Sequence, residues 1–294
     1  MNATLLVVLH DSEPDVEVLL RSIERHLPTA PELVVVDSGS SDGGAALAER
    51  HGARVVRLPG NPGFGAANVA GLQHVRTPVT VLLNPDVELL DDGLSRLVDL
   101  AAARDALVVP RLLNADGSVQ RSAHPEPGTA RALVPALVHP RLLPRRLRLE
   151  ADPWRSDTPR RVGWAIAAVV AARTDTLRRL GPFDPAAFLF FEDLELCLRA
   201  AAAGVPTELH PEIALRHAGG HSTRPAYHGE PHELLARRRR EVVGAHLGRR
   251  ALALDDLAQG VTFASRALAH RGRDRERAQL RALIHARRTP VTFM

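Results

Sequence analysis

Carboxylate and amide side chains follow several short apolar runs of this sequence, at the points where β-strands would end. Asp37 follows the run Leu33–Val36, and Asn84 and Asp86 follow the run Val79–Leu83. In open parallel sheets, ligands bind outside the carboxyl ends of the strands. A carboxylate there can accept a hydrogen bond from a nucleotide base or bind a hard divalent cation through oxygen. These side chains therefore predict a nucleotide or metal site at one edge of a sheet.

Two segments rich in small residues accompany these acids. They are Asp37–Gly43 (DSGSSDG) and Gly60–Asn68 (GNPGFGAAN). Glycine and serine let a ligand approach the backbone closely, and asparagine amides can bind ribose or sugar hydroxyls. The alternative is that these residues, and Asp86 with them, serve only as turns and helix caps. The candidate binding residues in and around these segments are His10, Ser38, Asn61, Gly65 and Asn68.

The elements that must position these residues alternate along the first 110 residues. Short apolar runs predict strands, and apolar residues at a spacing of three to four predict helices. This β-α order predicts an α/β fold with a mainly parallel sheet and helices on both faces. The strands are expected at Thr4–Leu9, Leu33–Val36, Arg54–Leu58, Val79–Leu83 and Ala106–Pro110, and the helices at Asp15–Leu27, Ala45–His51, Ala66–Val75 and Gly93–Arg104.

The pattern is less regular after residue 110. Asn114–Gly117 predicts a tight turn. Residues 124–161 are rich in proline and arginine, which predicts a long excursion or mobile segment outside the core. A strand is expected at Arg161–Ala171 and a helix at Asp193–Ala203, closed by Gly204. Residues 232–294 predict two or three basic helices.

Composition excludes several chemistries. The chain has 294 residues, and all 38 residues counted as lysine or arginine are arginine. The absence of lysine excludes a P-loop of the GxxxxGK[ST] type and Schiff-base catalysis, and a common kinase would lack its phosphate-pairing lysine. No GxGxxG follows the first apolar run, which argues against a dinucleotide-binding Rossmann site.

Charge is distributed unevenly along the chain. Residues 1–120 contain 16 acidic residues and 9 arginines, whereas residues 121–294 contain 18 acidic residues and 29 arginines. A basic second half is typical of proteins with an anionic partner, such as nucleic acid, an acidic membrane surface or a phosphorylated substrate. The alternative is that a GC-rich genome encodes many arginines regardless of function.

Other features bear on the cellular compartment. The single Cys197 cannot form an intramolecular disulfide, which fits a reducing compartment. The sequence contains no run of about 18 apolar residues, so it predicts no membrane span. The segment Met1–His10 lacks the basic region of a signal peptide. We therefore expect a cytoplasmic protein.

Five segments in this order and spacing resemble family 2 glycosyltransferases of the GT-A fold. The first three are VVVDSGSSDGG (34–44), GNPGFGAAN (60–68) and LLNPDV (82–87). The fourth, GPFDPAAFLFFEDLELCLR (181–199), is similar to GxFDExFFxYxEDxDLxxR, and the fifth, RHAGGHST (216–223), is similar to HxxxxS. NADGS (114–118) and VGW (162–164) resemble rhamnosyltransferases that act on polyprenyl-diphosphate-linked sugars in bacterial cell-wall assembly. The resemblance covers about residues 3–225.

The resemblance implies catalytic and metal-binding roles. Asp193 matches the general base that takes the proton of the acceptor hydroxyl, and one displacement with one base inverts the anomeric carbon. Glu192 would orient the acceptor. Asp86 and His217 match a metal site for Mg²⁺ or Mn²⁺, which would neutralise the leaving diphosphate. The alternatives are that Asp193 stabilises a helix N-terminus and that His217 is a core or loop histidine.

The resemblance also implies a donor pocket. Asp37 would bind the pyrimidine of a dTDP- or UDP-sugar, Asn61 and Asn68 would shape the ribose and diphosphate pocket, and Trp164 would line the sugar or acceptor site. The expected domains are a GT-A catalytic domain at 1–229, with a nucleotide-sugar half at 1–120 and an acceptor half at 121–229, and basic C-terminal helices at 230–294.

The sequence departs from the family pattern at three places. The DxD motif is Asn84-Pro85-Asp86 here, with one carboxylate, although Asn84 can ligate weakly or face the ribose. The second acid of EDxD is Glu195, which is one methylene longer, and this puts its role in doubt. Apolar residues 165–169 replace the small polar residues that commonly follow Gly-Trp in the relatives.

The leading prediction is an inverting, metal-dependent glycosyltransferase that moves a sugar, rhamnose by resemblance, to a lipid-diphosphate-linked glycan. A soluble natural product or a peptide is the alternative acceptor. Arginines at 141, 145, 146 and 148 and the run Arg237–Arg240 would hold the enzyme at the anionic inner face of the cell membrane, unless they form a solvated helical face.

Two other classes fit less well. A sugar-nucleotide nucleotidyltransferase relies on a glycine-rich loop after the first strand and on lysines, and this chain has neither. A protein that binds single-stranded nucleic acid stacks bases on aromatic rings. This chain has only 7 Phe, 2 Trp and 1 Tyr, and they are not interleaved with the arginine-rich helices. We therefore expect no nucleic-acid partner.

Overall fold

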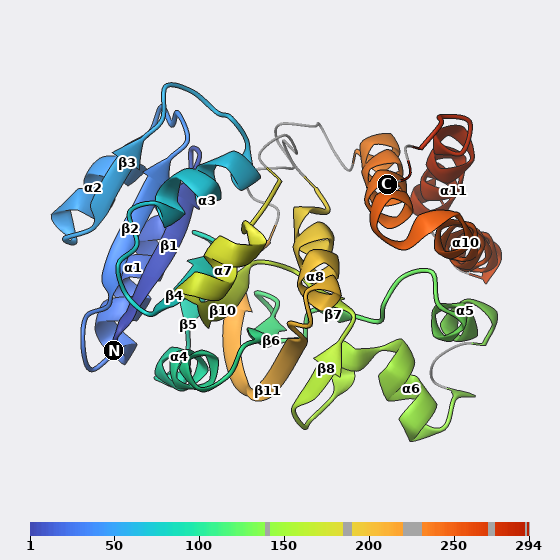
Figure 1. Ribbon diagram of the computed structural model, residues 1–294, viewed down its shortest axis with the longest axis horizontal. Helices are drawn as coiled ribbons and strands as arrows, with labels where there is room; N and C mark the ends of the chain where they lie inside the picture. Colours follow the sequence, from blue (N-terminus) through green and yellow to red (C-terminus); the bar gives the residue numbers. More distant parts are fainter. Residues whose placement is uncertain (139–141, 185–189, 220–230, 270–273, 292, 294) are drawn as a thin grey trace.

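The computed structural model (Figure 1) describes residues 1–138, 142–184, 190–219, 231–269, 274–291 and 293. Its first part alternates strands and helices in the order predicted from the sequence. The elements are β1 (Ala3–Leu9), α1 (Glu13–His26), β2 (Glu32–Asp37), α2 (Gly44–Arg50), β3 (Arg54–Arg57), α3 (Phe64–Leu72) and β4 (Val79–Leu83).

Strand β1 lies inside this sheet because its side chains are apolar on both faces. Alternate residues of a strand point to opposite faces. Leu5 and Leu9 belong to the core on the face covered by α1, whereas Leu6 belongs to the core on the face covered by α3. Gly71 lets α3 approach, since a Cβ there would collide with the side chains of Leu6 and Val36.

The second part adds mainly antiparallel pairings to the same sheet. Its strands are β5 (Val87–Leu89), β6 (Leu107–Leu113), β8 (Arg160–Val162), β10 (Val169–Arg173) and β11 (Thr207–His217), and β7 (Ala123–His124) pairs with β9 (Trp164–Ala165) in a separate small sheet. The strand order is β3-β2-β1-β4-β10-β6-β11-β5, with β8 paired to β11. The predicted α/β fold with a mixed sheet and helices on both faces is confirmed.

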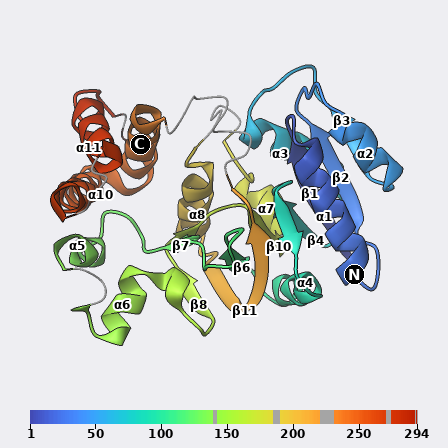
Figure 2. The same ribbon diagram turned by 180° about the vertical axis from the view of Figure 1, so that it is seen from behind.

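Helices surround this second part. They are α4 (Gly93–Ala103), α5 (Ala130–Leu137), α6 (Arg145–Ala151), the short 3₁₀ helix η2 (Pro153–Arg155), α7 (Thr174–Leu180) and α8 (Glu192–Ala202). Side chains of α8 complete the core on the same sheet face as α3. The helix lies between the sheet and the C-terminal helices in both views (Figures 1 and 2).

Three sequence predictions were wrong in detail. The strand expected at Arg161–Ala171 is divided into β8, β9 and the start of β10, because the Gly163 backbone packs against Pro125 and Glu126. The excursion at 124–161 contains α5 and α6, and Ala151 and Pro153 within it are buried. Strand β11 was not predicted, since a register shift between His210 and Ala214 interrupts its alternation.

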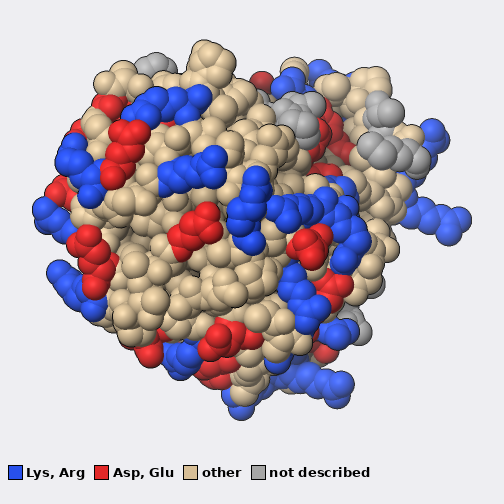
Figure 3. All heavy atoms as spheres, turned by 60° about the vertical axis from the view of Figure 1, so that its left-hand side comes forward, with Lys and Arg blue, Asp and Glu red and all other residues tan. Residues whose placement is uncertain are grey.

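The C-terminal helices form a separate layer beside α5 and α8. Helix α10 (His232–Ala269) is broken at Gly248, where φ is 79° and ψ is −178°, and α11 (Asp274–Ala286) packs along it. Among the described residues, no helix combines the length and apolar character that a bilayer crossing requires. On the face shown in Figure 3, acidic and basic side chains are interspersed.

Candidate active site

Three parallel strands deliver candidate residues to one edge of the sheet. Leu9 of β1 lies opposite Asp37 of β2, and β4 runs parallel to β1 on its other side. The residues that follow these strands, His10, Ser38 and Asn84, therefore leave the sheet at the same edge. The fold brings the strand-end candidates together as the sequence predicted.

Hydrogen bonds join the loops that follow β1, β2 and β3. The Ser38 hydroxyl donates to Asn61 Oδ1 at 3.2 Å, and the Gly63 N–H donates to the same oxygen at 3.0 Å. His10 Nδ1 lies 3.0 Å from the Ser38 carbonyl oxygen. The loops also meet through glycine, because a Cβ on Gly39 would lie 2.8 Å from the Gly60 carbonyl carbon. Only a small residue fits this contact.

Three other candidates near these loops are buried. The Ser40 N–H donates to Asp37 Oδ1 at 2.9 Å, so one carboxylate oxygen already closes the loop. Asn68 Nδ2 donates to the Phe64 carbonyl at 2.9 Å within α3, and Gly65 is buried in the first turn of that helix. Asp37 and Asn68 therefore also have a structural role, because their side chains stabilise a loop and a helix turn.

A second cluster joins the β4–β5 connection to the end of β11. Strand β5 pairs with β11, and His217 lies opposite Val87. His217 Nε2 lies 3.3 Å from Asp86 Oδ1 and 3.4 Å from Asn84 Nδ2. The Gly219 N–H donates to Asp86 Oδ2 at 2.9 Å. Residues 84, 86 and 217, which are far apart in sequence, thus meet as expected for a shared site.

Gln120, which the sequence did not single out, fixes the ring of His217. Its Oε1 lies 2.9 Å from His217 Nδ1. This contact turns Nε2 toward Asp86 and Asn84. Burial by itself raises the pKa of Asp86, but the hydrogen bond and charge of His217 and the Gly219 N–H outweigh it and lower the net pKa. Asp86 is therefore held as a carboxylate.

The chemistry of this cluster suits a divalent cation. Asn84 Oδ1 is buried and has no hydrogen-bond partner among the described residues, although its amide nitrogen faces His217. An imidazole nitrogen, a carboxylate oxygen and this amide oxygen are all cation ligands. Among the described residues, however, no three or more histidine, cysteine, aspartate or glutamate side chains gather as a metal-binding group.

The acid pair lies at the start of α8. Glu192 and Asp193 form its first turn, directly after Phe190 and Phe191, whose φ angles are 73° and 61°. Left-handed backbone at bulky residues costs about 1–3 kcal/mol each and occurs mostly at functional sites. The Leu194 N–H donates to Asp193 Oδ1 at 2.7 Å. This conformation is not visible in the sequence.

Burial dominates the electrostatics of the acid pair. It raises the pKa of both carboxyl groups, and the charge of Asp193 raises the pKa of Glu192 further. Backbone N–H groups of Leu194 and Ala167 partly offset the effect on Asp193. Glu192 Oε2 is buried and finds no hydrogen-bond partner in the part of the chain that the structure describes. One proton is therefore retained most readily on Glu192, which leaves the negative charge on Asp193.

A short turn connects the acid pair to the second cluster. The backbone N–H of Ala167 lowers the pKa of Asp193, and the carbonyl of the next residue, Ala168, accepts a hydrogen bond from the Asn84 N–H at 2.9 Å. Ala167 and Ala168 thus connect Asp193 with Asn84. The apolar segment that departs from the family pattern supplies this turn.

Trp164 lies beside the acid pair and is held by aromatic contacts. Its ring stacks on His124 with centroids 4.2 Å apart, and the ring of Phe191 is 6.3 Å away. Burial and the charge of Arg239 lower the pKa of His124 to about 3, so that this ring is neutral. The sequence indicated Trp164 but not His124, because the two rings come together only when β7 pairs with β9.

Glu195 does not join the candidate base. Its carboxylate is paired with Arg199, with an N–O distance of 2.8 Å, and His246 Nε2 lies 3.3 Å away. Arg199 in turn donates to the carbonyl of Gly181 at 2.7 Å. Glu195 therefore anchors α8 to its surroundings. Residues 185–189 and 220–223 of the matched motifs, and Arg141, lie outside the described residues.

The arginine run at 237–240 does not form one surface. Successive helix residues point about 100° apart, so four of them surround the helix. Arg239 and Arg240 are buried in ion pairs with Asp255 and Asp256. The prediction that this run contacts anionic lipid is therefore wrong for these two.

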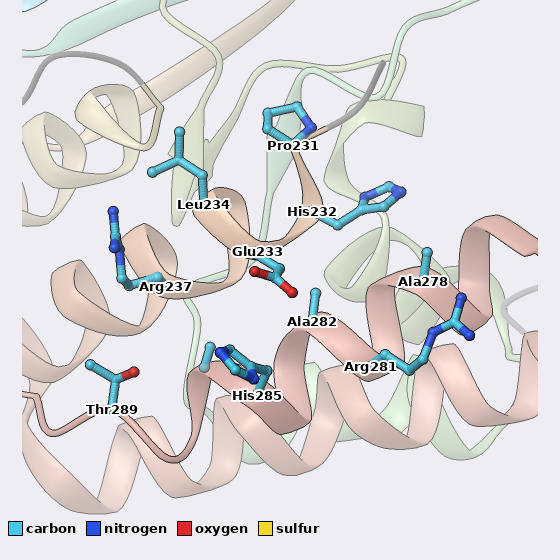
Figure 4. Close-up of a pocket in the computed structure, with 11 residues that line it drawn as sticks. Pro231, His232, Glu233, Leu234, Arg237, Ala278, Arg281, Ala282, His285 and Thr289 are labelled. Atoms are coloured by element: carbon cyan, nitrogen blue, oxygen red, sulfur yellow. The ribbon is translucent and has the colours of Figure 1, made fainter. Parts of the chain in front are cut away.

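Arg237 points elsewhere and lines a cavity of about 740 Å³ between the start of α10 and α11 (Figure 4). Glu233, Arg281 and His285 also line this cavity. None of the candidate site residues lines it. The cavity is therefore separate from the candidate active site.

Comparisons with known proteins agree with this fold and site. Residues 4–160 match the family model Glycosyl transferase family 2. The chain is 26% identical to an N-acetylglucosaminyl-diphospho-decaprenol L-rhamnosyltransferase of Mycobacterium tuberculosis, across 78% of this chain and 80% of that protein.

Solved structures share the fold at low identity. A mannosyltransferase of Pyrobaculum calidifontis in complex with GDP-Man and Mn²⁺ superposes with a TM-score of 0.62 at 16% identity, across 97% of this chain and 86% of that one. The first 349 residues of S. aureus TarS, in complex with UDP-GlcNAc, give 0.56 at 14% identity, across 97% and 80%.

The sheet and these matches define the class of the protein as a glycosyltransferase of the GT-A fold. The chain belongs to glycosyl transferase family 2.

Proposed function

We propose that this enzyme transfers a sugar from a dTDP- or UDP-sugar to an acceptor hydroxyl, with inversion and with a divalent cation. The turn at residues 167–168 carries the proposal, because the Ala167 N–H lowers the pKa of Asp193 and the Ala168 carbonyl accepts a hydrogen bond from Asn84. A base and a leaving-group site must lie close together if both act on one anomeric carbon.

The joined loops after β1, β2 and β3 bind the nucleotide in this proposal. Asp37 retains one carboxylate oxygen that is not used by Ser40 and can accept from a base N–H. His10, Ser38 and Asn61 are already linked and form one wall, while Gly65 and Asn68 fix the start of α3 behind it. The glycine at 39 lets these loops meet, because a Cβ there would collide with the backbone of Gly60.

Asp86 and His217 would hold Mg²⁺ or Mn²⁺, with Asn84 as a weaker ligand. When bound, the cation would neutralise the charge that develops on the leaving diphosphate. Gln120 orients His217 so that Nε2 faces the site. With no lysine in the chain, the cation, arginine side chains and helix N-termini share this task.

Asp193 acts as the general base. Its backbone hydrogen bonds keep it ionised beside a more readily protonated Glu192. Glu192 Oε2 is buried and has no partner within the described ranges, so it suits an acceptor hydroxyl, which can both donate and accept. Trp164 provides an apolar wall for the sugar or acceptor.

The similarity to the mycobacterial rhamnosyltransferase supports rhamnose as the sugar and a lipid-diphosphate-linked glycan as the acceptor. A soluble natural product or a peptide is the alternative acceptor. The bound nucleotides of the two solved relatives differ, GDP in one and UDP in the other, so the fold alone does not select the base.

A thermal-shift panel tests the donor. Nucleotides and nucleotide sugars bearing uracil, thymine or guanine would be added with and without Mn²⁺. A ligand at 100 times its Kd stabilises the native state by about 2.7 kcal/mol, so the true donor should raise Tm most and do so more with Mn²⁺. The absence of any shift with dTDP or UDP compounds would overturn the donor assignment.

Exposed leucines and arginines of α5, of α6 and of the segment before α6, together called the ridge here, support contact with an anionic membrane surface. Leu137, Leu142 and Leu147 are 71%, 78% and 44% exposed. Arg145 and Arg146 lie exposed between them, on α6. Apolar side chains beside arginines suit the interface of an acidic bilayer, where each basic residue contributes about 1 kcal/mol. This ridge replaces the arginine run of α10 as the proposed membrane contact.

Sedimentation with liposomes of phosphatidylglycerol and phosphatidylcholine tests this contact. The double variant L142S/L147S should lose binding, whereas L268S, which removes a leucine of 76% exposure on α10, should retain it. Equal binding by both variants, or no binding by the native protein at moderate salt, would refute the membrane contact. Neither result bears on the transfer chemistry.

A further inference from the structure

Two neighbouring ion pairs join the halves of α10 across its break at Gly248. Arg239 donates two hydrogen bonds to Asp255, both of 2.8 Å, and Arg240 donates to Asp256 at 3.1 and 3.2 Å. In each pair the partners are 16 residues apart. All four side chains are largely buried. The pairs are therefore matched in chemistry, separation and burial.

The two arginines face different parts of the molecule. Arg240 also donates to the Ala286 carbonyl at 2.6 Å, so it holds α11. The guanidinium carbon of Arg239 lies 5.8 Å from the ring centre of Phe191, and its charge acts on Asp193. Helices α10 and α8 pack against each other. Only one of the two pairs therefore reaches the acid pair.

We propose that Arg239 is a positioning residue of the active site, which holds Phe191 and the Asp193 carboxylate in place from the C-terminal helices. The proposal rests on the proposed role of Asp193 as base. It assigns the predicted helical region 230–294 a part in the chemistry. Asp255 is included as the residue that fixes the guanidinium.

The acid pair needs such a partner. Two successive left-handed residues, Phe190 and Phe191, persist only where surrounding contacts hold them. Burial raises the pKa of Asp193, and the positive charge of Arg239 counteracts this. A guanidinium remains charged when buried, and Asp255 supplies its counter-ion.

Other charged and titratable groups near the acid pair are accounted for. Asp193 and Glu192 act on each other within α8, and Arg238 of α10 acts on Glu192. Burial raises the pKa of the Cys197 thiol to about 11, and that of His124 is low, so both are neutral. Arg239 is therefore the cation of α10 that acts on Asp193 itself.

Carboxyl titration by ¹³C NMR of the full-length protein tests the proposal without any substrate. The resonance absent from D193N identifies Asp193. In R239Q the apparent pKa of this resonance should rise by about one unit, as expected when an opposite charge is removed. R239K should restore most of the native value. R240Q, which breaks the matched pair, should lower Tm to a similar extent and leave the titration unchanged.

Two results would overturn the proposal. One is an unchanged Asp193 titration in R239Q. The other is an equal rise in R240Q, which would indicate a general loosening of the helices. Once a donor is known, R239Q should also displace the acidic limb of the kcat profile to higher pH without changing KM for the donor. Turnover by D193N would refute the base assignment alone, because the titration reports on Arg239 independently.

Discussion

The two halves of the candidate site are built differently. In the nucleotide half, contacts join residues of the same loop or of neighbouring loops: Asp37 binds Ser40, Asn61 binds Gly63, and Ser38 binds Asn61, which lies 23 residues away. In the acceptor half, contacting residues lie much farther apart in the sequence. His217 is held by Gln120, which lies 97 residues earlier, and Arg239 of α10 contacts Phe191. Parallel strands place the first set by topology alone, whereas the second set depends on tertiary packing.

The difference has a consequence for function. Local contacts make a binding surface that forms with its βα unit. Distant contacts instead tie the general base, the candidate metal cluster and the C-terminal helices to one packing arrangement. We therefore expect substitutions in the acceptor half to affect catalysis over longer distances than substitutions in the nucleotide half. Four predictions test this comparison.

The largest effect is expected from D193N. Loss of a general base typically lowers turnover by a factor of about 10²–10⁴. Donor binding should persist, because Asp193 belongs to the acceptor half. Steady-state rates and thermal shifts with the donor measure the two quantities. E195Q is the control: it weakens the Arg199 pair and stability but should retain turnover. Native turnover in D193N would remove Asp193 as base.

Q120L should weaken metal binding without touching the ligands. Loss of a residue that orients a metal-bound histidine typically costs about 10–100-fold in metal affinity or activity. The Mn²⁺ concentration for half-maximal activity measures the change. S118A, which removes a hydroxyl from the neighbouring exposed turn, is the control. An unchanged Mn²⁺ requirement would show that Gln120 does not act through His217.

Two glycine substitutions compare the halves directly. In G163A the new methyl group meets the backbone of Pro125 and Glu126, which cannot move without separating β7 from β9. In G71A it meets the side chains of Leu6 and Val36, which can adjust, and alanine also favours the helix. We expect G163A to cost about 1–3 kcal/mol and G71A less. Urea denaturation compares the free energies of unfolding. The reverse order would contradict the assignment of Gly163 as the stricter contact.

The smallest effect is expected in the pH dependence of stability for E192Q. The folded-state pKa of Glu192 is raised, so the native protein binds more protons than the unfolded chain, and stability falls as pH rises through this interval. E192Q removes that loss. Its Tm should exceed the native value above the raised pKa and approach it at low pH, by about 2–4 °C per kcal/mol. A Tm difference that does not change with pH would contradict the raised pKa of Glu192.

Much of the nucleotide half could be predicted from sequence because its signals are local. Apolar runs located β1, β2 and β4 within one or two residues, and the residue after each strand must lie at the ligand edge of a parallel sheet. The motif positions Asp86, Asp193 and His217 were also found, although their roles remain predictions.

The remainder could not be read from the chain. Strand β11 was hidden by its register shift, and the left-handed backbone at Phe190 has no sequence signal. His124 and Gln120 gain a partner only through packing. The membrane role predicted for the arginine run on α10 was wrong for Arg239 and Arg240. The sequence does not show that each of them pairs with an aspartate in the folded protein.

The sequence by itself determined the parallel α/β core, the family and the order of the site motifs, because hydrophobic period and strand-end chemistry act over a few residues. Tertiary structure alone decided that Asn84, Asp86 and His217 converge, that two carboxyls are buried side by side, and that Arg239 reaches them from the C-terminal helices. The physical reason is that burial sets the protonation of acids and the partner of each arginine, and burial is a property of the folded chain.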